Sequence, residues 1–283
     1  MTSRYDFLVA DSETAAEREQ RRRSAGKSAG ESYAATLAQI APGCTVEVRA
    51  PADSGQPEIT GADLRYDAVF VSGSPLHVYC DTPETRRQLA FMRAVFAAGV
   101  PSFGSCAGLQ VAAAAAGGTV RKMPTRREAG LVRRITATAE GRNHPLLAGR
   151  PAAWDALSIH GDEVETLPDG ATLLATNWAA QVQAAEIRCG KGVFWGVQYH
   201  PELAPGEIAT ALRRDAADLA ETGLVDSPDH VEAQAALFDR LHREPDSRDV
   251  RWRLGVDDSV AIEDRRRTEL RNFIGAIGTD ALR

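Results

Sequence analysis

Short apolar runs alternate with longer amphipathic segments through the first 116 residues. Buried strands of a parallel sheet read as short continuous apolar runs, whereas helices place apolar residues three or four positions apart. On these patterns we expect strands at residues 5–10, 45–49, 68–72 and 100–104 and helices at 32–40, 83–97 and 107–116. Strands that alternate with helices indicate βα units on a parallel sheet, so the sequence predicts an α/β fold.

The pattern changes after residue 116, where the chain continues in shorter, strand-like stretches. Short runs bounded by glycine, proline and polar residues are typical of antiparallel strands. We expect strands here at residues 118–122, 128–137, 153–158, 171–176, 181–188 and 192–199. They predict a small antiparallel extension, followed by strands that return to the main sheet.

From Pro205 onward the chain is highly charged, and its apolar residues recur at the spacing of amphipathic helices. The sequence therefore predicts two units. The first is an α/β domain over residues 1–204, and the second is a helical extension over 205–283 that packs on the core or serves for docking. We expect the charged segment 13–31 to be a solvated surface and the arginine run 265–267 to be an exposed helix face.

The composition does not place the chain in any specialised class of protein. The chain has 283 residues, 43% hydrophobic and 25% charged, which is enough to bury a core. A net charge of −6 and a pI near 5.6 give no overall attraction to nucleic acid or an anionic membrane, so neither partner is expected. The four cysteines are too few for a disulfide scaffold, and the chain shows no signal pattern or membrane-span-like run. We therefore expect a cytoplasmic protein.

The clearest chemical signal is the stretch Gly104-Ser105-Cys106-Ala107-Gly108, between an apolar strand and an alanine-rich helix. A nucleophile on such a strand-to-helix elbow needs small neighbours because the turn is tight. The helix N-terminus favours a thiolate, and the Ala107 N–H is placed to donate to an oxyanion. Taken alone, the stretch also fits a buried cysteine behind a glycine-rich turn.

A cysteine nucleophile needs a base, and His200-Pro201-Glu202 offers one at the end of the strand expected at 192–199. Pro201 fixes the backbone, so Glu202 can reach the imidazole, orient it and stabilise its charged form. Taken alone, this stretch also fits a loop histidine beside a surface acid. The elbow at Cys106 favours the catalytic interpretation.

A third stretch, Ser72-Gly73-Ser74-Pro75, follows the strand expected at 68–72. The carboxyl ends of strands in open α/β sheets form the edge where ligands bind. A turn at that edge can present a backbone N–H to an oxyanion beside the Ala107 amide, although by itself it is also an ordinary turn.

These three stretches, in this order, resemble the class I glutamine amidotransferases that use a Cys-His-Glu triad. The resemblance covers roughly residues 4–203. The stretches 158–164 (SIHGDEV) and 143–147 (NHPLL) narrow it to the glutaminase domain of GMP synthetases and to stand-alone proteins similar to it. The resemblance implies a three-layer, flavodoxin-like core with a mostly parallel central sheet.

It also implies roles for individual residues. Cys106 would attack the side-chain amide of glutamine and form a γ-glutamyl thioester. His200 would protonate the departing ammonia and then activate water, while Glu202 orients the imidazole. The oxyanion would be held by the backbone of Ser74 and Ala107. The positions that match the family's substrate contacts are Gly73, Gln110, Ile159, Gly161 and Asp162.

Two departures from the family bear on function. The turn carries Ser74 where two glycines are common, so we expect Ser74 to adopt a conformation that glycine adopts more freely. Residues 205–283 are too short for a synthetase domain and contain no glycine-rich pyrophosphate-binding segment, so the chain is not expected to be a complete GMP synthetase.

Three functions stay open. The first is a glutaminase that supplies ammonia to a separate acceptor enzyme, the second a hydrolase of other γ-glutamyl amides or peptides, and the third a catalytically silent regulatory module. A metal site at His160, Asp162, His200 and Glu202 is an alternative, but the resemblance accounts for both histidine–acid pairs without one. We expect no metal, ATP or other cofactor. Expected partners are glutamine or a γ-glutamyl compound, with a synthetase or a second copy of the chain possible.

Overall fold

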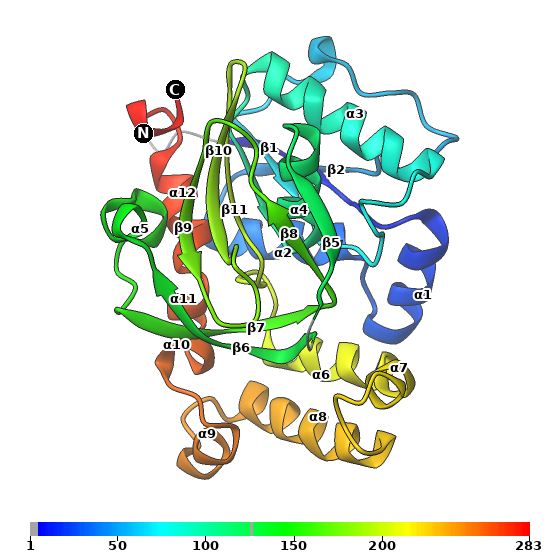
Figure 1. The fold of residues 1–283 in the computed structure, drawn as a ribbon, viewed down its shortest axis with the longest axis vertical. Helices are drawn as coiled ribbons and strands as arrows, with labels where there is room; N and C mark the ends of the chain where they lie inside the picture. The colour runs from blue at the N-terminus through cyan, green and yellow to red at the C-terminus, as the bar shows by residue number, and fades with distance from the viewer. Residues whose placement is uncertain (1–4, 125–126) are drawn as a thin grey trace.

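The computed structural model describes residues 5–124 and 127–283. Within these residues, nine strands form one sheet in the order β2-β1-β3-β4-β11-β10-β9-β6-β7, and β5 pairs with β8 in a second, two-stranded sheet (Figure 1). The strands of the large sheet are β1 Asp6–Ala10, β2 Thr45–Arg49, β3 Ala68–Val71, β4 Ser102–Ser105, β6 Glu128–Ala137, β7 Ala153–His160, β9 Ala171–Thr176, β10 Ala184–Cys189 and β11 Gly192–Val197. Those of the small sheet are β5 Thr119–Lys122 and β8 Asp162–Thr166.

Five neighbouring strands of the large sheet are parallel: β2, β1, β3, β4 and β11. The remaining four, β10, β9, β6 and β7, continue the sheet antiparallel. The carboxyl ends of β3, β4 and β11 therefore meet at one edge, and these are the strands that precede the three stretches singled out in the sequence.

Helices cover both faces of the sheet. Alternate residues of β1 point to opposite sides: Phe7 lies in the core beneath α2 and α12, whereas Leu8 lies in the core beneath α3 and α4. This arrangement is the expected three-layer α/β fold. The helices are α1 Ala15–Ala25, α2 Ala29–Ile40, α3 Pro83–Ala98, α4 Ala107–Ala115, α5 Ala139–Asn143, α6 Pro205–Arg214, α7 Ala216–Glu221, α8 Pro228–Arg243, α9 Arg248–Leu254, α10 Asp258–Ala261, α11 Glu263–Arg266 and α12 Thr268–Ala276, with short 3-10 turns at Gly61–Asp63, Pro145–Leu147 and Asp280–Leu282.

The segment after Pro205 packs in two places. Figure 1 shows α6 to α9 gathered beside β6 and β7, where Phe238 and Leu212 join Leu157 of β7 in a third apolar core. The chain then returns to the main sheet, and Phe273 of α12 packs its ring against those of Phe70, Phe103 and Trp195. The boundary between 204 and 205 stays a prediction.

Several local expectations need correction. The second helix begins at Ala29, because Ser28 caps it in a capping box with Glu31. Strand β8 was not expected from the sequence. In the arginine run only Arg265 is exposed; Arg266 is buried and donates to the carbonyls of Leu203, Val260 and Ala261. Burial lowers the pKa of Arg266 to about 10. Among the described residues, no helix combines the length and the apolar character that crossing a membrane requires.

Candidate active site

Cys106 lies on a sharp turn between β4 and α4. Its backbone angles are φ 55° and ψ −112°, a conformation that costs a residue with a side chain about 1–3 kcal/mol. Glycine on both sides makes the turn possible: a Cβ at Gly108 would collide with the Val71 carbonyl, and one at Gly104 would lie 2.8 Å from Gly108. The Cys106 N–H donates to the Val197 carbonyl at 2.8 Å, which fixes the turn between β4 and β11. The expected elbow is present.

His200 and Glu202 form a buried pair at the end of β11. Nδ1 of His200 lies 2.7 Å from Oε1 of Glu202, and both side chains are at least nine-tenths buried. The backbone holds the loop in place, because the His200 N–H donates to the Leu157 carbonyl and Thr36 Oγ1 donates to the Glu202 carbonyl.

The charge state of His200 follows from these contacts. Burial lowers its pKa, but the carboxylate of Glu202 and the sulfur of Cys106 outweigh burial and raise the pKa of His200 to about 10. The imidazole is therefore protonated at neutral pH. A positive charge beside a cysteine sulfur stabilises the thiolate, which is the form that attacks.

The turn after β3 packs against both groups. A Cβ at Gly73 would lie 2.9 Å from Cε1 of His200 and 3.6 Å from Cβ of Cys106. Glycine is therefore required here by close approach. Ser74 needs no such freedom: among the described residues, the non-glycine positions with positive φ are Cys106 and Arg134. The expectation of a glycine-like conformation at Ser74 was wrong.

The turn at residues 159–162, where β7 passes into β8, brings one backbone carbonyl close to the sulfur. Sγ of Cys106 lies 4.0 Å from the Ile159 carbonyl oxygen. Nε2 of Gln110 donates to the Asp162 carbonyl at 3.0 Å, so the Gln110 side chain fixes this loop as well as lining the cavity. Gly161 lies on the same cavity wall. The structure thus brings Ile159, Gly161, Asp162 and Gln110 together beside the candidate nucleophile.

The Asp162 carboxylate has partners that sequence reasoning missed. Nδ1 of His77 lies 2.6 Å from Oδ2, and the Tyr79 hydroxyl donates to Oδ1 at 3.2 Å. Both residues come from the chain that continues the Ser72–Pro75 turn. Their proximity depends on how this loop folds over β8, and β8 itself was not expected.

His160 contributes to the fold of the loop. Its Nε2 lies 3.0 Å from Oε2 of Glu128, and its Nδ1 lies 2.8 Å from the Asp162 carbonyl. His160 thus pairs with the carboxylate of Glu128 and not with that of Asp162, whereas His200 pairs with Glu202 as expected. In the described parts of the chain, no three His, Cys, Asp or Glu side chains are grouped as a metal site would require.

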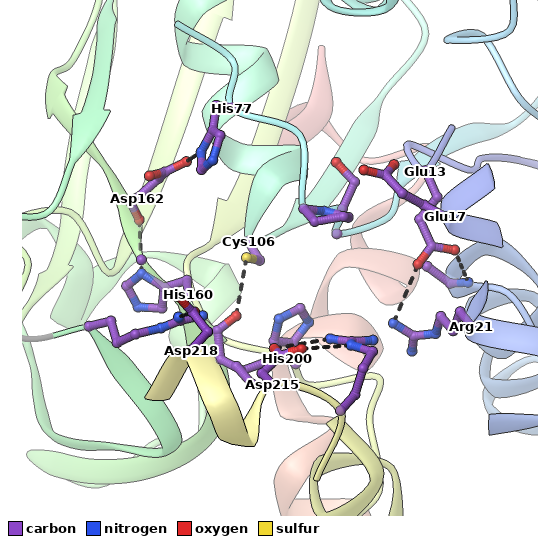
Figure 2. A pocket seen from close by; sticks show the side chains of 18 of the residues that line it. Glu13, Glu17, Arg21, His77, Cys106, His160, Asp162, His200, Asp215 and Asp218 are labelled. Atoms are coloured by element: carbon purple, nitrogen blue, oxygen red, sulfur yellow. Dashed lines mark hydrogen bonds and ion pairs between the residues drawn. The ribbon is translucent and has the colours of Figure 1, made fainter. Parts of the chain in front are cut away.

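Cys106 opens onto a cavity of about 840 Å³ (Figure 2). Its walls include all the candidate residues named above except Ala107, which follows Cys106 directly. The cavity extends well beyond the nucleophile, to walls that the sequence did not indicate. These walls are formed by the β1–α1 connection with α1, and by the end of α6 with α7: Glu13, Glu17, Gln20 and Arg21 on the first, and Arg214, Asp215, Ala217 and Asp218 on the second.

One sequence signal for the first wall existed. Glu13 lies three residues after β1, and β1 is parallel to β3, so both strands end at the same edge of the sheet. The Ser12 N–H donates to Oγ of Ser72 at 3.0 Å, which joins the end of β1 to the turn that carries Gly73. A charged residue so soon after a buried strand is a signal for this edge.

Comparison with known proteins gives one family. The model of the family described as "Glutamine amidotransferase class-I" matches residues 25–218. The gamma-glutamyl-L-1-hydroxyisopropylamide hydrolase of a Pseudomonas species is 36% identical over 234 residues, 81% of this chain and 78% of that protein. The glutamine-hydrolysing GMP synthase of Leifsonia xyli is 33% identical over 157 residues, 54% of this chain but only 30% of the synthase.

Two solved structures share the fold over nearly the whole chain. A glutamine amidotransferase from Methylobacillus flagellatus gives a TM-score of 0.62 at 17% identity, covering 98% of this chain and 96% of its own. One from Thermotoga maritima gives 0.62 at 16% identity, covering 96% and 97%. Both alignments include the segment after Pro205, so the likeness in fold extends beyond the α/β core.

Proposed function

The chain belongs to the class I glutamine amidotransferase family, and from that premise we propose that it hydrolyses γ-glutamyl amides whose amine is larger than ammonia. Cys106 is the proposed nucleophile, His200 the acid and base, and Glu202 the residue that orients His200. No cofactor takes part in the proposed steps.

The proposed reaction has two steps. In the first, Sγ of Cys106 attacks the γ-carbonyl carbon, a C–S bond forms, and the backbone N–H groups of Ser74 and Ala107 hold the oxyanion. The C–N bond then breaks, and the amine leaves with a proton from His200. In the second step, water gives a proton to His200 and attacks the thioester, which releases glutamate and restores the Cys106 thiolate.

The γ-glutamyl half of the substrate is assigned to the wall at residues 159–162. The Ile159 carbonyl oxygen lies 4.0 Å from the sulfur there, and Gln110 holds the Asp162 carbonyl. The resemblance to the family implies these positions as substrate contacts. Gly73 lies beside the His200 ring and Cβ of Cys106. The acyl chain is thus expected to run from Cys106 toward Gly161.

The size of the cavity is the observation that favours a substituted amide over free glutamine. Its volume of about 840 Å³ lies in the upper part of the range, about 300–1,000 Å³, of pockets that enclose drug-sized ligands, and free glutamine would leave much of it unfilled. Helices α6 and α7 of the same chain form one wall. The Pseudomonas relative, named for a γ-glutamyl amide substrate, is similar to this chain over most of both lengths.

A second candidate function is glutamine hydrolysis with delivery of ammonia to a separate acceptor. Sequence reasoning placed this function first, and the similarity to glutamine-hydrolysing GMP synthases favours it. We place it second because the chain itself walls the cavity on the side of α7. An acceptor enzyme would have to receive ammonia past that wall.

The two functions are separated by glutamate release from glutamine, γ-glutamylpropylamide and γ-glutamyl-2-hydroxyethylamide. We expect kcat/KM for at least one of the substituted amides to exceed that for glutamine by more than tenfold. Cys106→Ala should abolish release, whereas Cys189→Ala, which removes a cysteine at the end of β10, should not. Preferred turnover of glutamine would favour the amidotransferase. Turnover that survives Cys106→Ala would exclude the proposed chemistry.

A further inference from the structure

Helix α1 is not held in place by buried apolar side chains. None of its residues is buried, although both ends are capped and Thr14 forms a capping box with Glu17. A helix that is polar all round must be held by other interactions. Ion pairs hold this one: Arg18 with Asp53 and Arg22 with Glu31.

One stripe of α1 faces the cavity. Glu17, Gln20 and Arg21 are spaced i, i+3 and i+4, which places them on one side of the helix, and all three line the cavity. Arg22 and Arg23 lie outside it and pair with Glu31 and Glu19. The charged run expected to be a solvated surface is therefore divided between solvent and the candidate site.

Glu13 is the most buried charged residue of this wall, with a relative exposure of 3%. Its Oε2 accepts a hydrogen bond from the Ala29 N–H at 2.9 Å, at the start of α2. Its Oε1 lies 3.8 Å from Nη1 of Arg21, which is longer than a hydrogen bond. Among the residues that the structure describes, Oε1 has no hydrogen-bond partner, so one acceptor at the cavity wall stays unused.

Arg21 also has a hydrogen-bond donor without a partner among the described residues. Its contact with Glu13 is the one ion pair that it makes among the described residues, and its Nε is buried without a hydrogen-bond partner there. Arg214, a second arginine of the cavity wall, is already engaged by Asp215 at 2.8 Å. The cavity wall therefore presents one carboxylate oxygen and one guanidinium nitrogen side by side, and neither is hydrogen-bonded to the other.

The position of this pair identifies which half of a substrate it can meet. Figure 2 shows Asp162, His77 and His160 on one side of Cys106, and Glu13, Glu17 and Arg21 on the other. The proposed function assigns the γ-glutamyl half to the Asp162 side. The leaving amine must then extend to the side of Glu13.

We propose that Glu13 and Arg21 form a subsite that recognises a hydroxyl group on the leaving amine. A hydroxyl donates one hydrogen bond and accepts another, so it can bridge Oε1 of Glu13 and Nη1 of Arg21. A carboxylate would be repelled by Glu13, an ammonium by Arg21, and an alkyl group would leave both polar groups unpaired. The inference rests on the proposed γ-glutamyl amide hydrolase and specifies its substrate class as γ-glutamyl amides of amino alcohols.

The test compares three substrates with the same γ-glutamyl half: the 2-hydroxyethylamide, the propylamide, in which methyl replaces the hydroxyl, and γ-glutamylglycine, which carries a carboxylate. We expect wild-type kcat/KM for the hydroxyethylamide to exceed that for each of the other two about tenfold, since one net hydrogen bond to a charged group is worth at least that ratio. Equal values for hydroxyethylamide and propylamide would overturn the subsite without touching the proposed function. Turnover of glutamine alone would overturn both.

Substitution of Glu13 tests whether this residue causes the preference for a hydroxyl group. Glu13→Gln keeps an acceptor for the Ala29 N–H but turns an amide NH₂ toward the cavity, so the hydroxyethylamide-to-propylamide ratio should fall to within about twofold. Glu19→Gln, on the solvent side of α1, should keep the wild-type ratio. The ratio does not depend on the fraction of folded enzyme. If Glu13→Gln keeps the full preference for the hydroxyethylamide, residues other than Glu13 recognise the hydroxyl. If the variant does not fold, the ratio of hydroxyethylamide to propylamide kcat/KM in the wild type decides the proposal.

Discussion

The pair of His200 and Glu202 sets the charge of the candidate site. Cys106 and Glu202 hold the imidazole protonated although it is buried, and the proposed mechanism uses that proton when the amine departs. Loss of the proton should end activity at high pH. The alkaline limb of the kcat/KM profile then reports the pKa of His200 in the free enzyme.

Glu202→Gln tests this assignment. Removing the carboxylate leaves burial, which disfavours the imidazolium, against the sulfur alone, so the pKa of His200 must fall from about 10. We expect the alkaline limb of kcat/KM to move by more than one pH unit toward neutral pH, and kcat to fall by about 10²-fold or more. Profiles of both proteins between pH 6 and 10.5 give the comparison. An unmoved limb would show that another group controls it.

Individual side chains differ in how far sequence can predict them. Cys106, His200 and Glu202 stand in stretches with their own local signals, and the structure places them together. Glu13 carries only the weaker signal of its position just after β1, and His77 carries none. Each becomes part of the cavity only because strands and loops distant in sequence end at one edge, so their roles depend on tertiary structure.

The strand-to-helix turn at Cys106 stores strain that a substitution can measure. In an ordinary helix, glycine is less stable than alanine by about 0.5–1 kcal/mol. At φ 55° and ψ −112° the order should reverse, because a Cβ costs about 1–3 kcal/mol there. We expect Cys106→Gly to unfold in urea with a free energy about 1 kcal/mol higher than Cys106→Ala, although both lack the sulfur.

Ala90→Gly supplies the control, since this exposed residue lies in the middle of α3 and should lose stability. If Cys106→Gly is also less stable than Cys106→Ala, the turn carries no strain of the kind described.

Strands and helices with strong periodic patterns were predicted from sequence almost to the residue. Strands β6 and β9 have the expected bounds, and α4 differs by one residue. Strand β8 was missed because residues 162–166 are mostly acidic and its pairing with β5 is what makes it a strand. Helix α1 was missed as a cavity wall because a polar helix carries no apolar stripe that would identify the side facing the protein.

Helix α12, near the end of the chain, contacts the residue that precedes the candidate base. Glu269 of α12 is fully buried, pairs with Arg150 at 2.6 Å and accepts a hydrogen bond from the Tyr199 hydroxyl at 2.7 Å. Tyr199 immediately precedes His200. The helical segment expected to be an appendage therefore supports the loop that carries the candidate base, which its charged composition did not reveal.

Phe273→Ala tests whether α12 is part of the folded core. The Phe273 ring is fully buried against three aromatic rings of the sheet, and we expect its loss to lower the free energy of unfolding by about 3–5 kcal/mol. Trp252→Ala removes a larger side chain that is 82% exposed, so its effect should stay within about 0.5 kcal/mol. Urea unfolding of both variants is the measurement. A loss below about 1 kcal/mol in Phe273→Ala would mean that α12 is not part of the folded core.

The most direct test of the account is intact-mass spectrometry of the enzyme during turnover of a γ-glutamyl amide, followed by peptide mapping. We expect one γ-glutamyl group on the peptide that contains Cys106. This adduct should accumulate in Glu202→Gln, where hydrolysis is slower, and it should be absent in Cys106→Ala. Release of glutamate without any adduct in the wild type and in Glu202→Gln, or an adduct on another residue, would contradict the proposed mechanism.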